Sequence, residues 1–79
     1  MFSKNDKNGR KIVFRGLRVE YLSEVAIIKR EHDYIIALGY DTKTGTWAQG
    51  IYDFINIVDA FKHIFKKYDI KIIYSIDIA

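Results

Sequence analysis

The chain has 79 residues, a formal net charge of +3, 49% hydrophobic and 15% aromatic residues, and no cysteine. This length allows a single domain over residues 1–79, and this composition predicts a folded globule rather than a disordered chain. Disulfides and thiolate-bound metals are excluded, and the positive charge excludes an acidic mimic of DNA. A core this small needs added stabilisation, so we expect a homo-oligomer, in the simplest case a dimer.

The beginning of the chain carries most of the basic excess. Residues 1–18 hold six basic groups and one acidic group, whereas residues 19–79 hold seven basic and nine acidic groups. We therefore expect residues 1–10 to form a flexible basic N-terminal arm on a nearly neutral body. The N-terminus is too polar for a signal peptide, and no apolar run reaches membrane-spanning length, so we expect a cytoplasmic protein that does not use a membrane.

The N-terminal half predicts an antiparallel meander. Residues 11–14 are apolar enough for a first strand. The alternation of apolar and polar residues over 17–21 predicts a second strand, or the continuation of the first past Gly16. Residues 24–40 predict a hairpin around the polar turn at residues 31–33.

Residues 40–50 contain the only tryptophan of the chain. Asp41 can accept hydrogen bonds from the backbone of its own turn, and Gly45 can take a positive φ without steric cost. The stretch predicts a hairpin loop from Asp41 to Gly45, followed by a strand over residues 46–54. Trp47 can pack under the helix or remain exposed for binding, and the sequence favours neither arrangement.

The C-terminal part predicts one helix and one strand. Asn56 is a good N-cap, and apolar residues recur at helical spacing from Ile57 onward on one side of a helix over residues 57–68. Residues 70–77 alternate in polarity, with one strongly apolar face. We place this last strand in parallel beside the strand that holds Trp47, while another position in the sheet stays open.

Together these elements predict an α+β fold. It consists of an antiparallel β-meander of four or five strands with one amphipathic helix (57–68) on one face and a C-terminal strand (70–77), in the order β-β-β-β-α-β. A single helix covers only one face of such a sheet. The opposite face must therefore be polar or be buried by a partner, and Ile73 together with Trp47 favours the partner.

Two short stretches resemble enzyme motifs, but each lacks the full pattern that the chemistry requires. Lys43-Thr44-Gly45 matches a tripeptide of penicillin-binding enzymes, but no serine is followed by lysine three residues later, as that chemistry requires. The same stretch differs from the phosphorylation site of cation-pumping ATPases by an inserted threonine. No spacing of carboxylates and histidines indicates a metal site or an acid–base pair. We expect no enzyme activity, no catalytic residue, no metal and no cofactor.

Binding functions remain open. Protein recognition is favoured by large aromatic side chains and by an uncovered sheet face or edge, and its candidate partner- or ligand-binding residues are Tyr40, Lys43, Trp47, Gln49 and Tyr52. Nucleic-acid binding is an alternative, because basic groups contact phosphates and aromatic rings stack on bases; its candidate residues are Arg10, Lys11, Arg15 and Arg18. A second alternative is a dimer cleft that sequesters a nucleotide signal.

Residues 40–50, YDTKTGTWAQG, are followed by Tyr52 and a helix start near Asn56. This order resembles a stretch in small uncharacterised accessory proteins of Gram-positive phages and mobile elements, over residues 38–65. The resemblance implies a small non-enzymatic protein of that origin, acting in the cytoplasm of a bacterial host by binding a host protein or ribonucleoprotein. Inhibition of a bacterial defence system is the most concrete form of this function.

Overall fold

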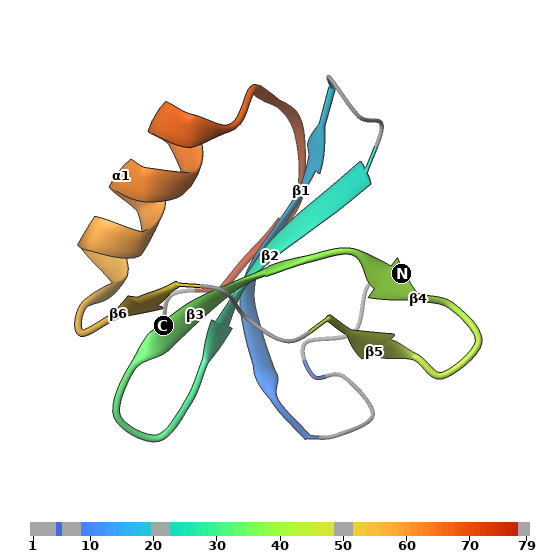
Figure 1. The fold of residues 1–79 in the computed structure, drawn as a ribbon, viewed down its shortest axis with the longest axis horizontal. Coiled ribbons are helices and arrows are strands. Elements are labelled where there is room, and N and C mark those ends of the chain that lie inside the picture. The colour runs from blue at the N-terminus through green and yellow to red at the C-terminus, as the bar shows by residue number, and fades with distance from the viewer. Residues whose placement is uncertain (1–4, 6–8, 20–22, 49–51, 78–79) are drawn as a thin grey trace.

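The computed structural model describes residues 5, 9–19, 23–48 and 52–77 (Figure 1). The fold is α+β, as the sequence predicts, with one helix between the meander and the last strand. The elements, in chain order, are β1 (Lys11–Arg18), β2 (Ser23–Lys29), β3 (Tyr34–Leu38), β4 (Tyr40–Asp41), β5 (Thr46–Trp47), β6 (Asp53–Phe54), α1 (Ile57–Lys67) and β7 (Ile70–Ile76).

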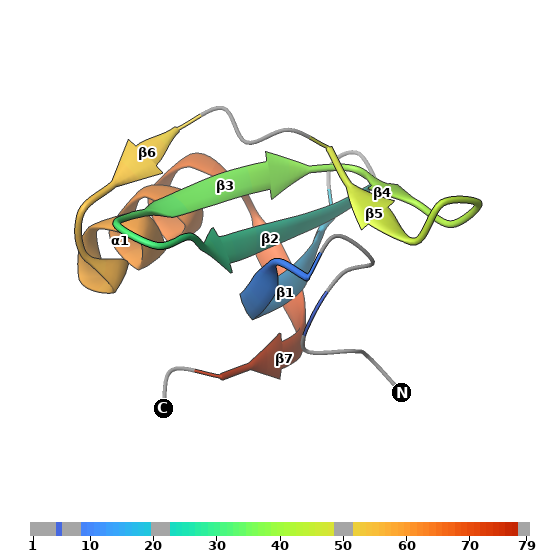
Figure 2. The ribbon, with the colours of Figure 1, turned by 90° about the horizontal axis from the view of Figure 1, so that it is seen from below.

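Five strands form one sheet in the order β6-β3-β2-β1-β7, and each pairs antiparallel with its neighbours. Figure 2 shows β6 and β7 at its two edges. The hairpin predicted over residues 24–40 is confirmed, since β2 pairs with β3 and sets Ala26 opposite Ala37. β1 runs without a break through Gly16, so the continuation past this glycine is the correct alternative.

Two predicted strand placements are wrong. β7 does not pair in parallel with the strand of Trp47; it pairs antiparallel with β1. The strand predicted over residues 46–54 is divided, because β5 pairs with β4 in a separate two-stranded sheet and β6 pairs with β3. β3 lies between β2 and β6, so β7 joins the sheet at its other end, beside β1.

The helix forms at the predicted place. The Asn56 side chain accepts a hydrogen bond from the backbone N of Asp59 at 2.9 Å, which caps the first turn. The helix ends at Lys67, one residue before the predicted end, because Tyr68 has extended backbone angles. Among the described residues, no helix has both the length and the apolar character needed to cross a membrane.

The apolar side of α1 packs on one face of the sheet. Phe14 of β1 is fully buried there, with its ring 5.5 Å from the rings of both Phe61 and Phe65 in edge-to-face geometry. We call this group the helix-side cluster; its buried members are Val13, Phe14, Val25, Ile27, Ile36, Ala60 and Ile64. It supplies the larger of two apolar layers.

The opposite face of the sheet is apolar as well. Its buried residues form the hairpin-side cluster, which consists of Ile12, Ala26, Ile28, Ile35, Ala37 and Trp47. In Figure 1 the β4–β5 hairpin lies on the other side of the sheet from α1. The chain itself therefore covers part of the face that the sequence assigned to polar residues or to a partner.

Gly16 lies where three groups meet. A Cβ at this position would lie 3.0 Å from Cζ of Phe14 and 3.1 Å from both Cγ2 of Ile70 and the carbonyl oxygen of Ile72. We expect Gly16→Ala to lower the free energy of unfolding by about 1–3 kcal/mol, because the buried ring and a backbone carbonyl have little room to move. Urea unfolding followed by circular dichroism measures this.

The control for Gly16→Ala is Glu31→Ala, at an exposed turn position, which should change stability by less than about 0.5 kcal/mol. Equal unfolding midpoints for the two variants would contradict the close packing of β7 on β1.

Candidate functional site

The turn of the β4–β5 hairpin is held by its own hydrogen bonds. Oδ1 of Asp41 accepts from the backbone N of Lys43 at 2.9 Å and of Thr44 at 3.4 Å. The backbone N of Gly45, where φ is 71°, donates to the carbonyl oxygen of Asp41 at 2.8 Å. The hydroxyls of Thr44 and Thr46 share a hydrogen bond of 2.7 Å. The predicted turn is confirmed, and its exposed tip is held in one shape.

Trp47 anchors the hairpin to the sheet. Only 4% of the residue is exposed, and it belongs to the hairpin-side cluster. The ring of Tyr40 lies 5.2 Å from the indole, and Nη2 of Arg10 donates to the Trp47 carbonyl oxygen at 2.8 Å. The tryptophan is therefore a core residue, but it packs on the sheet face opposite the helix rather than under it.

A charged pair lies beneath the two rings. Nε of Arg15 donates to Oε1 of Glu24 at 2.5 Å and Nη2 donates to Oε2 at 3.0 Å, a bidentate arrangement. The guanidinium carbon lies 4.6 Å from the centre of the Tyr40 ring and 5.2 Å from that of Trp47. Arg15 is 8% exposed. The carboxylate and the two π faces offset the cost of burying this charge.

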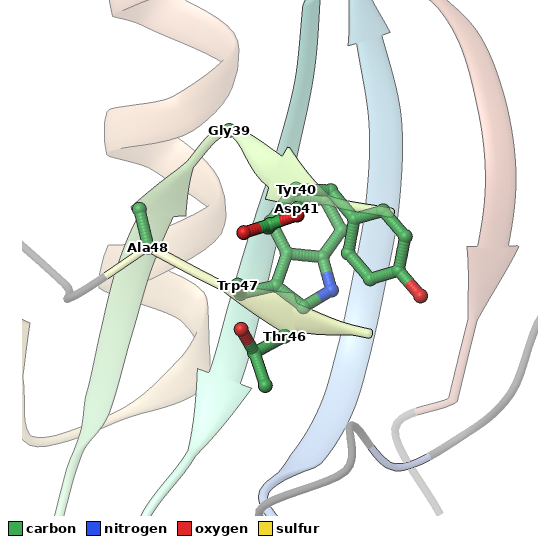
Figure 3. Close-up of a pocket in the computed structure, with 6 residues that line it drawn as sticks. All are labelled: Gly39, Tyr40, Asp41, Thr46, Trp47 and Ala48. Atoms are coloured by element: carbon green, nitrogen blue, oxygen red, sulfur yellow. The ribbon is translucent and has the colours of Figure 1, made fainter. Parts of the chain in front are cut away.

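Beside the rings, the hairpin borders an open, shallow hollow of about 440 Å³ (Figure 3). Its lining comes from both hairpin strands and the residues next to them, namely Gly39, Tyr40, Asp41, Thr46, Trp47 and Ala48. Figure 3 shows the rings of Tyr40 and Trp47 side by side. The lining thus combines the rings of Tyr40 and Trp47 with the carboxylate of Asp41 and the hydroxyl of Thr46.

The structure brings three of the predicted partner-binding residues together. Tyr40 and Trp47 pair across the hairpin, and Lys43 lies at its exposed tip. Gln49 lies outside the described residues. Tyr52 is separated from the others, because it packs against the helix-side cluster.

The surroundings of Tyr52 are those of a helix contact. Its ring lies 4.4 Å from the ring of His63, which also contacts Phe54 at 5.3 Å. The Tyr52 hydroxyl is hydrogen-bonded to Nζ of Lys67, which raises the pKa of Lys67 above its ordinary value. These contacts tie β6 to α1 and do not extend the hollow at the hairpin.

The basic residues proposed for nucleic-acid contact do not share one surface. Arg15 is paired with Glu24 under the hairpin. Arg18 donates to Oγ of Ser23 at 2.5 Å and lies 5.4 Å from the centre of the Tyr68 ring. Lys11 begins β1, where it forms an isolated bridge with Asn5 and lies opposite Lys29 of β2. Arg10 donates to the carbonyl oxygen of Trp47. Apart from residues 5, 9 and 10, the predicted arm over residues 1–10 lies outside the described residues.

Sequence reasoning missed Glu24 as a member of this site. The signal was available in part, because Arg15 is a charge between apolar neighbours in a strand, and such a charge needs a partner. Its partner comes from the adjacent strand, one diagonal step along the ladder, since Leu17 is the residue opposite Glu24. Nothing in the local sequence indicates that diagonal.

Within the described residues, no group of three or more histidines, cysteines and carboxylates could hold a metal ion. Comparison with known proteins gives no match to a protein-family model, a curated protein or a solved structure.

The Arg15–Glu24 pair generates a stability prediction. Arg15→Met leaves a partly buried carboxylate without its guanidinium, and we expect a loss of about 2–3 kcal/mol in unfolding free energy. Because Glu24→Leu removes that carboxylate, the double variant should lose at least about 1 kcal/mol less than the sum of the single variants. Urea unfolding of all four proteins completes the cycle.

The Arg30–Asp33 pair is the matched control, since it is also bidentate but the side chain of its arginine is 46% exposed. The same cycle there should show much weaker coupling, as solvent screens surface pairs. Additive effects at Arg15 and Glu24 would show that these two side chains do not stabilise each other.

Proposed function

We propose that this chain is a small non-enzymatic binding protein, encoded by a phage or mobile element, which binds a host macromolecule through the β4–β5 hairpin. One observation carries the proposal: the exposed tip from Thr42 to Thr44 is stiffened by Asp41 and anchored by the buried Trp47. A loop already held in one conformation loses little entropy on binding, so more of its contact energy becomes affinity.

The chemistry of the hollow favours a protein as the partner. Its aromatic walls suit an apolar or aromatic side chain, while Asp41 and Thr46 offer hydrogen-bonding oxygens at the same place. Lys43, exposed at the tip, suits an acidic group on the partner. A component of a bacterial defence system is the target class we put forward, in keeping with the resemblance of residues 38–65 to phage accessory proteins.

The two alternatives have less support from the geometry. Phosphate binding needs available cations, but Arg10, Arg15 and Arg18 contact protein groups. Capture of an anionic nucleotide in the hollow would set its phosphates near the Asp41 carboxylate. A protein partner requires neither available cations nor an anionic group beside this carboxylate.

The test uses affinity capture from lysate of a bacterial host, with wild-type protein and Lys43→Glu as baits. We expect wild type to retain a host protein, and Lys43→Glu to retain about tenfold less of it, because the tip charge is reversed. Lys62→Glu, an equal charge change at an exposed helix position, is the control and should retain as much as wild type. Equal retention by all three baits would remove the hairpin as the binding surface.

The alternatives are tested with purified protein. We expect no binding to a short single-stranded oligonucleotide at low ionic strength, measured by fluorescence anisotropy, and no rise in melting temperature with cyclic dinucleotides. Salt-sensitive binding to the oligonucleotide would favour the nucleic-acid function instead, and a rise in melting temperature would favour nucleotide capture.

A further inference from the structure

The last strand forms a long apolar edge of the main sheet. β7 has seven residues and lies outermost, next to β1 (Figure 2). No strand among the described residues pairs with its outer side. β6, at the opposite edge, has only two residues. A long strand edge of this kind presents backbone N–H and C=O groups that can pair with another strand.

Apolar side chains continue from this edge toward the helix. Ile72, Ile73 and Ile76 are 48%, 48% and 51% exposed. Phe65 of α1 is 46% exposed, and its ring packs on Phe14, the residue opposite Ile76 in the β1–β7 ladder. Half-exposed isoleucines on an edge strand beside an exposed phenylalanine form a surface that contact with another chain would bury.

We infer that a second copy of this chain pairs with the edge, β7 against β7 in antiparallel orientation, about a two-fold axis at Tyr74. The two sheets then become one continuous sheet, and the two helices lie on the same face of it. The backbone edges satisfy each other, and the isoleucines of both copies gain cover. This interface uses a different part of the molecule from the hairpin and does not depend on its function.

Charge complementarity selects this register. With the axis at Tyr74, Lys71 lies opposite the partner's Asp77, and Ile72 lies opposite the partner's Ile76. Two-fold symmetry repeats each pair, so at both ends of the interface Lys71, which already lies 3.3 Å from Oδ1 of Asp69 in its own chain, faces a second carboxylate. Moving the axis to Ile73 instead sets Asp69 opposite the partner's Asp77, which places like charges across the strands.

The irregularity of β7 favours its own copy over other strands. Two register shifts in the β1–β7 ladder leave Tyr74 and Lys71 as extra residues on the β7 side. Such bulges increase local twist and hinder the addition of a flat strand. A second copy carries the same twist, and the two-fold axis at Tyr74 sets one bulge against the other.

Charge exchange tests the register by sedimentation equilibrium. We expect wild type to form a dimer, and Lys71→Asp or Asp77→Lys each to weaken it about tenfold, because each sets like charges opposite one another twice. An equimolar mixture of the two variants should regain the wild-type affinity as a heterodimer, since every aspartate then faces a lysine. Lys62→Asp, on the exposed side of α1, is the control and should not change the affinity.

A monomeric wild type at millimolar concentration would overturn the inference. A dimer whose affinity is unaltered by the two charge changes would also overturn it. The same holds if the mixed variants dimerise no more tightly than each variant alone, or if the protein forms open-ended assemblies.

A cysteine at the axis gives an independent check, because the natural chain has none. Residues opposite one another in antiparallel strands lie within disulfide reach, so oxidised Tyr74→Cys should become a covalent dimer. Lys62→Cys is the control and should remain uncrosslinked under the same conditions. Equal crosslinking of the two variants, or none in Tyr74→Cys, would contradict the axis.

Discussion

The position of the hairpin depends on one buried guanidinium. Arg15 projects from β1 and is bound by Glu24 of β2 on one side and by the rings of Tyr40 and Trp47 on the other. Because the carboxylate balances its charge, the two rings can close over it and complete the hairpin-side cluster. Without the Glu24 carboxylate, Trp47 would have to pack against an uncompensated charge, which would weaken the contact of the hairpin with the sheet.

This arrangement explains how a chain of 79 residues without cysteine builds a core. Apolar residues are divided between two layers, one around Phe14 beneath α1 and one around Trp47 beneath the hairpin. Each layer is small, but both use the same central strands, so these strands are buried on both faces. The hairpin tip and the edge of β7, the two proposed binding surfaces, lie on different elements.

Local signals predicted most of the fold. The Asn56 cap, the helical stripe and the Asp41–Gly45 turn depend on neighbours within a few residues, and all three are present. The predicted pairing of β7 and the predicted continuous strand over residues 46–54 were wrong. Both depend on how strands far apart in the sequence pair with one another, which no local signal gives. For the same reason, sequence grouped Tyr52 with Trp47, although β6 carries the chain from the hairpin face to the helix side.

Quenching of Trp47 fluorescence by acrylamide tests most directly whether the chain covers its own second sheet face. The chain has one tryptophan, so the signal reports this position alone. We expect the Stern–Volmer constant of the wild type to be several-fold below that of free indole, and to rise toward it in Arg15→Met. Quenching of the wild type as strong as that of free indole would show that the hairpin does not lie on the sheet.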